Sequence, residues 1–66
     1  MTQVKDITDG EIILACQAYH AGAAPTPDIA LVDKYPQKVI LKKMEKMVLE
    51  NKLEYGVTLR TAWVVR

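Results

Sequence analysis

Cys16 and His20 are the side chains best suited to covalent or metal chemistry, because they are the single cysteine and the single histidine of this 66-residue chain. They lie four residues apart, which places them on one face of a helix if the segment is helical. A metal site needs three or four such ligands, and a cysteine nucleophile needs a base and a group that orients that base. Nothing else in the sequence completes either set. We therefore expect Cys16 to pack in the core and His20 to have a structural or surface role.

The length of the chain also argues against an enzyme. A domain of this size buries a thin core, and a substrate pocket of several hundred cubic ångströms would consume most of it. The sequence has no glycine-rich phosphate loop, no paired carboxylates and no Ser-His-Asp set. We expect one small domain over residues 1–66 without enzymatic activity, cofactor or bound metal, in which residues 1–6 are frayed or form a short strand.

Composition indicates a soluble protein of the cytoplasm. A single cysteine excludes an internal disulfide, and no apolar stretch approaches the roughly 18 residues of a membrane span. The first six residues lack the charged-then-apolar pattern of a signal peptide. We expect a cytoplasmic location and no membrane partner.

Charge is distributed unevenly along the chain, although the net charge is only +1. Residues 1–33 carry one basic and five acidic side chains, whereas residues 34–66 carry eight basic and three acidic side chains. A small domain polarised in this way can present a basic face to a polyanion. The alternative is a solvated surface whose charge is merely uneven.

Capping residues predict three helices. Thr8 and Glu11 have the spacing of a capping box, so we expect the first helix over residues 9–20, with Gly22 as its left-handed cap. Thr26 can cap a short second helix over about residues 27–33. Pro36 opens a third helix over about residues 36–51.

Apolar spacing predicts which faces of these helices are buried. The stripe of the first helix comprises Ile12, Ile13, Cys16 and Tyr19. The stripe of the third comprises Ile40, Leu41, Met44, Met47 and Val48. On the opposite face of the third helix, Lys38, Lys42 and Lys46 recur every four residues and should meet solvent.

The end of the chain changes from helical to extended character. Residues 53–57 and 59–65 are rich in β-branched and aromatic side chains, which favours a hairpin turning near residues 57–59, with Gly56 at a bend. We expect Trp63 to anchor the core, the alternative being an exposed aromatic at an interface. The fold class is therefore α+β, with three helices followed by a C-terminal β-hairpin.

This order of elements resembles a winged helix-turn-helix. Val39 to Tyr55 looks like a recognition helix that ends in a polar turn, after which Leu53-Glu54-Tyr55 begins the wing. The run from Tyr55 to Trp63 looks like that of small phage or prophage proteins of this type. The resemblance covers roughly residues 8–65.

The resemblance implies a role for each matching part. The third helix would enter the major groove of double-stranded DNA, where Gln37 would pair with adenine and Lys38 with guanine. Lys42 and Lys46 would contact phosphates. Lys34 would do so from before the helix, and Arg60 and Thr58 from the wing.

Two functions of different class follow from the sequence. The first is a small winged-helix DNA-binding protein, either a phage-type regulator or a recombination accessory protein. The alternative is a protein-interaction module that binds and modulates a host or phage protein without DNA. Either could act as a homodimer, because a thin core benefits from burying more apolar area.

Overall fold

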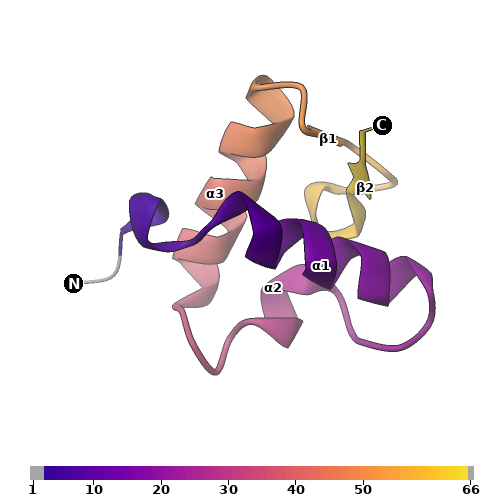
Figure 1. The fold of residues 1–66 in the computed structure, drawn as a ribbon, viewed down its shortest axis with the longest axis horizontal. Coiled ribbons are helices and arrows are strands. Elements are labelled where there is room, and N and C mark those ends of the chain that lie inside the picture. The colour runs from indigo at the N-terminus through magenta and orange to yellow at the C-terminus, as the bar shows by residue number, and fades with distance from the viewer. Residues whose placement is uncertain (1–2, 66) are drawn as a thin grey trace.

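The computed structural model describes residues 3–65, and in this part three α-helices precede a C-terminal antiparallel hairpin (Figure 1). The helices are α1 (Asp9–His20), α2 (Pro27–Ala30) and α3 (Gln37–Leu49). The strands are β1 (Leu53–Glu54) and β2 (Trp63–Val64), and Leu53 pairs with Val64. The predicted α+β class and element order are confirmed, and the topology is compatible with a winged helix.

The bounds of α1 follow from local interactions at its two ends. The Glu11 amide donates to the Thr8 hydroxyl over 3.3 Å, and the Thr8 amide donates to the Glu11 carboxylate over 3.4 Å, so the predicted capping box is present. At the other end, Gly22 has a φ of +78° and the Ala23 amide reaches the Ala18 carbonyl. This geometry ends a helix with a left-handed residue.

α3 also ends at a residue in the left-handed region, which here is an asparagine and not a glycine. Asn51 has a φ of +63°, and the Lys52 amide donates over 2.8 Å to the Met47 carbonyl. Asparagine tolerates the left-handed region better than most residues with a side chain. The predicted turn at the end of the third helix is thus confirmed, although the helix itself stops at Leu49.

One apolar core lies between α1, α3 and the hairpin. β2 packs against α1, whereas β1 packs against α3. The predicted stripes supply most of the core, although Ile13, Tyr19, Leu41 and Val48 are only half-buried. The buried residues that form the cluster are Ile7, Ile12, Cys16, Ile40, Met44, Met47, Leu53 and Ala62.

Two of the elements expected in the first half of the chain differ from those in the structure. Val4–Asp6 forms a 3-10 helix, η1, in place of a short strand, and residues 1 and 2 lie outside the described residues. α2 ends at Ala30, three residues earlier than predicted, and Thr26 makes no capping hydrogen bond from its side chain.

The predicted hairpin strands are also too long. Leu59–Thr61 forms a second 3-10 helix, η2, inside the loop, because the Thr61 hydroxyl interacts with the Thr58 backbone and holds a tight turn there. Trp63 is 54% exposed, so the prediction that it anchors the core is wrong. The core at this end is filled instead by Leu53 and Ala62.

Candidate nucleic-acid interface

The outward face of α3 carries three lysines at the spacing that the sequence predicted. Lys38, Lys42 and Lys46 are all exposed and follow one another by one helical turn, or about 6 Å of rise. Within residues 3–65, no ion pair engages any of them. Figure 1 shows the C-terminal end of α3 projecting at the top of the molecule, whereas η1 packs against this helix lower down.

This face is not purely basic. Glu45 is exposed between Lys42 and Lys46, and Leu49, which follows Lys46, leaves 78% of its surface in solvent. The glutamate lowers the local positive potential, and the leucine adds an apolar contact. The face therefore provides three separated cations rather than a continuous basic strip.

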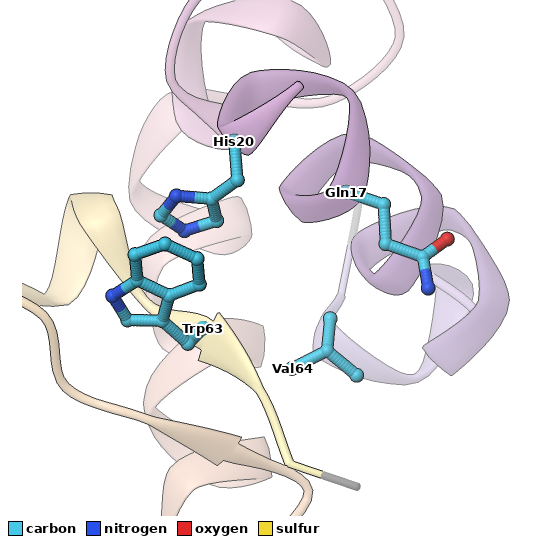
Figure 2. A pocket seen from close by; sticks show the side chains of 4 residues that line it. All are labelled: Gln17, His20, Trp63 and Val64. Atoms are coloured by element: carbon cyan, nitrogen blue, oxygen red, sulfur yellow. The ribbon is translucent and has the colours of Figure 1, made fainter. Parts of the chain in front are cut away.

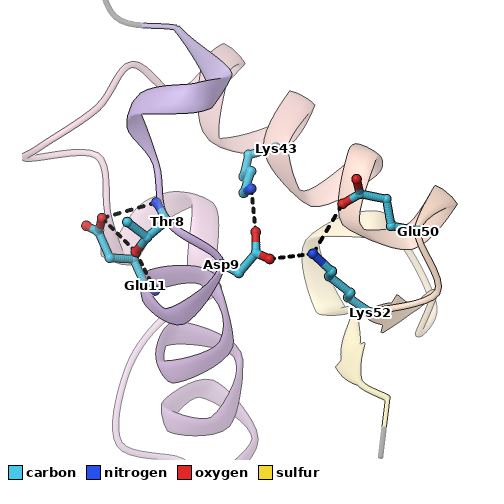
Figure 3. Close-up of polar contacts among 6 residues, drawn as sticks. All are labelled: Thr8, Asp9, Glu11, Lys43, Glu50 and Lys52. Carbon is cyan, nitrogen blue, oxygen red and sulfur yellow. Dashed lines mark hydrogen bonds and ion pairs between the residues drawn. The ribbon is translucent and has the colours of Figure 1, made fainter.

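Lys43 belongs to the interior, although it lies among these lysines in the sequence. It is only 7% exposed, and its Nζ lies 2.5 Å from Oδ1 of Asp9 (Figure 3). Lys52 binds the other oxygen of Asp9 at 2.5 Å and also approaches Glu50 at 3.6 Å. Asp9 thus joins the start of α1 to α3 and to the segment before β1.

The electrostatics of this cluster follow from the two ammonium groups. Hydrogen bonds from Lys43 and Lys52 lower the pKa of Asp9 to about 2. The hydrogen bond to Asp9 raises the pKa of Lys52. Lys43 lies on the apolar face between Ile40 and Met47 by helical spacing, which is the sequence signal that distinguishes it from the exposed lysines.

A second polar cluster adjoins the first turn of α3, and its centre is Asp28. This carboxylate is fully buried. Its Oδ2 accepts a hydrogen bond from Nε2 of Gln37 at 2.8 Å and forms an ion pair with Nε of Arg60 at 2.9 Å. Its Oδ1 has no hydrogen-bond partner among the described residues. Asp28 was not among the residues that the sequence singled out for function.

Asp28 remains ionised in this environment. Burial raises the pKa of Asp28, but the hydrogen bond from Gln37, the polar side chain of the neighbouring Thr26 and the charge of Arg60 together lower it by more, so the pKa lies below its ordinary value. Nε of the Arg60 guanidinium makes the ion pair with Asp28, and the side chain is half exposed. A guanidinium held in this way keeps its two terminal nitrogens for another oxygen acceptor.

The structure therefore divides the predicted site residues into three groups. Lys38, Lys42 and Lys46 share the outward face of α3. Gln37 and Arg60 meet at Asp28 beside the first turn of α3, where the Gln37 amide is already engaged. Lys34 is exposed in the turn after α2 and lines a hollow with Glu11 and residues of α1, apart from the other lysines.

Cys16 and His20 have the structural roles that the sequence indicated. Burial raises the pKa of the Cys16 thiol to about 11, so it stays protonated at neutral pH and is a poor nucleophile. Nε2 of His20 lies 3.0 Å from the Ala62 carbonyl oxygen. Among the described residues, no group of three or more histidine, cysteine or acidic side chains could hold a metal ion.

Comparison with known proteins found no match to this chain among protein-family models, curated proteins or solved structures. The likeness to a winged helix is therefore one of element order and topology. No helix within residues 3–65 has the length and apolar character needed to cross a bilayer.

Proposed function

We propose that this chain is a small winged-helix DNA-binding protein, acting as a phage-type regulator or a recombination accessory protein. The observation that carries the proposal is the row of Lys38, Lys42 and Lys46 on the uncovered face of α3. In winged-helix proteins the corresponding helix enters the major groove of double-stranded DNA. Cations at successive turns suit the phosphates that border the groove.

Arg60 adds a contact from the hairpin side. Its Nε forms an ion pair with the buried Asp28, which keeps the guanidinium beside the first turn of α3 before any DNA arrives. Orientation in the free protein lowers the entropy lost on binding. We assign phosphate contacts to Lys42, Lys46 and Arg60, and the base-reading position to Lys38, because Gln37 already donates to Asp28.

A titration of duplex DNA at several salt concentrations tests this function. Three phosphate contacts predict that log K falls with log salt with a slope of roughly −3. Substituting Lys42→Ala should lower affinity about fivefold and make the slope shallower by about one unit. Lys42→Arg should restore both.

Glu45→Ala is the matched control, because it truncates a neighbouring side chain on the same exposed face and removes a negative charge. Its affinity for DNA should equal or exceed that of the unchanged protein. Absence of binding at low salt, or a slope that Lys42→Ala leaves unchanged, would contradict the proposal.

A further inference from the structure

A second exposed surface lies around Trp63, on the hairpin and the C-terminal end of α1. Trp63 is 54% exposed and Val57, in the hairpin loop, is 97% exposed. In Figure 1, β2 and the end of α1 lie on the right of the molecule and α3 lies on the left. Trp63 and Val57 line the same hollow, and exposed apolar side chains that adjoin one another are typical of contact sites.

The indole of Trp63 is held in place by its neighbour His20. The two rings stack with centroids 3.4 Å apart and an angle of 10° between their planes (Figure 2). His20 is itself held by its contact with the Ala62 carbonyl oxygen and by the Tyr19 ring, which packs edge-to-face with it at a centroid distance of 4.9 Å. A ring that is already ordered loses little conformational entropy on binding.

Hollows flank this stacked pair on two sides. One is lined by Gln17, His20, Trp63 and Val64, and Figure 2 shows the Gln17 amide across this hollow from the indole. The other is lined by Tyr19, His20, Val57, Thr61 and Trp63. We call these seven lining residues together the Trp63 surface.

The charge of the Trp63 surface limits its partner. No acidic, lysine or arginine side chain lines either hollow, so nothing there neutralises a phosphate or a charged peptide side chain. Desolvating such a charge without a counter-charge is costly. The complementary partner is therefore an uncharged segment, not the DNA proposed for α3.

The area of the surface limits the size of the partner. Trp63 and Val57, the two exposed apolar residues of this surface, together expose an area on the order of 300 Å². A stable dimer needs about 800 Å² from each partner. A second folded copy of this chain would thus be held too weakly, whereas a short peptide segment needs no larger area.

The hydrogen-bond donors of the Trp63 surface indicate which kind of uncharged segment fits it. Within residues 3–65, no hydrogen bond uses the indole N–H of Trp63 or the side-chain amide of Gln17. A polyproline II segment has carbonyls without internal partners, and its proline rings pack flat on aromatic faces. It matches a surface of ordered aromatic rings, free N–H donors and no charge.

We propose that the Trp63 surface binds a short, uncharged, proline-rich segment of a partner protein in extended conformation. This binding uses residues remote from Lys38, Lys42 and Lys46 and goes beyond the DNA-binding function. The chain thus has two binding faces, a cationic one on α3 for DNA and an aromatic one around Trp63 for a peptide segment.

Fluorescence of Trp63, the single tryptophan of the chain, provides the test. A synthetic peptide of Pro-Pro-Ala repeats should change the emission saturably, with an affinity in the micromolar to millimolar range. A peptide of the same length with Ala in place of each Pro should cause no saturable change. Binding should be nearly the same at low and moderate salt, which separates it from DNA binding.

Val57→Ser tests the surface without disturbing the core, because Val57 is almost fully exposed. This substitution should weaken peptide binding several-fold. Tyr55→Ser is the control, since Tyr55 is an exposed apolar side chain of the same hairpin but lines neither hollow, and it should leave the affinity unchanged.

Two outcomes would overturn the proposal. One is an equal response to the proline and alanine peptides, or no response to either at millimolar concentration. The other is a dimer in analytical ultracentrifugation that Val57→Ser dissociates, which would assign the surface to a second copy of the chain. Neither outcome affects DNA binding through α3, which is measured separately.

Discussion

The buried Asp28 contacts both Gln37 and Arg60, two side chains to which the sequence analysis assigned DNA contacts. Gln37 donates a hydrogen bond to one oxygen of the Asp28 carboxylate, and Arg60 forms an ion pair with the same oxygen. A buried carboxylate that loses one of two partners is left with an uncompensated charge, which costs more than the interaction itself contributes. Arg60 therefore stabilises the fold as well as offering its terminal nitrogens to a ligand.

A double-mutant cycle on Asp28 and Arg60 measures this coupling. Arg60→Ala should lower the free energy of unfolding by about 2 kcal/mol, because it leaves the buried carboxylate with Gln37 alone. Asp28→Asn should cost a similar amount. The double variant should lose about 1 to 2 kcal/mol less than the two single effects added together, as measured by urea unfolding. Simple additivity would show that the two residues do not interact.

At the scale of the elements, the hairpin loop folds back closely on itself at Gly56. A Cβ atom placed on Gly56 would lie 2.5 Å from the Thr61 carbonyl oxygen and 2.8 Å from its hydroxyl. Backbone at such a distance cannot move aside without opening η2, which Thr58 and Thr61 hold together. The requirement here is for space and not for a positive φ.

Gly56→Ala should therefore destabilise the protein by about 1 to 3 kcal/mol, in the range of an overpacked site. Gly10→Ala is the matched control, because a Cβ atom on Gly10 would have nothing within 4 Å and the residue occupies the first turn of α1. That change should be neutral or stabilise by up to about 1 kcal/mol. Thermal unfolding of both variants checks the prediction, and equal midpoints would contradict it.

The same elements show how far the sequence alone determines the structure. α1 was predicted with its observed bounds because its capping box and its glycine cap are local interactions. The exposure of Lys38, Lys42 and Lys46 follows from helical periodicity in the same way. The pairs Asp9–Lys43 and Asp28–Arg60 join segments far apart in the chain, so no local pattern reveals them.

Trp63 and η2 illustrate why the hairpin was harder to predict. β-branched and aromatic residues favour strands, but the hydrogen bonds between Thr58 and Thr61 stabilise a tight turn instead. Ala62 then occupies the buried position next to Trp63, and the indole packs on His20 at the surface. Which of two adjacent side chains enters a small core depends on the space left by the helices.

At the scale of the whole molecule, folding brings the two oppositely charged halves of the chain together. Asp9 binds Lys43 and Lys52, and Asp28 binds Arg60, so acidic residues of the first half compensate basic residues of the second. The lysines of the second half that make no ion pair within residues 3–65 are Lys34, Lys38, Lys42 and Lys46. Internal pairing thus leaves three of these four cations on α3.

This pairing makes stability depend on pH through Asp9. Its pKa is about 2 in the folded protein, below its ordinary value of 3.8, because Lys43 and Lys52 bind the ionised form. A carboxylate with a lowered pKa contributes its full stabilisation above about pH 4 and loses it as the pH falls through 2. Glu11, whose pKa is lowered by the Tyr35 hydroxyl, and Asp28 change stability in the same direction.

The free energy of unfolding should consequently decrease between about pH 5 and pH 2, as measured by urea unfolding at a series of pH values. Asp9→Asn should lower stability at neutral pH and flatten this decrease, because the group that titrates is gone while Glu11 and Asp28 remain. Asp33→Asn, which removes an exposed carboxylate outside the ion pairs, should keep the pH dependence of the unchanged protein. If Asp9→Asn retained the full dependence, the link that Asp9 makes between α1, α3 and the hairpin would not be a source of stability, and the orientation of α3 would rest on its apolar face alone.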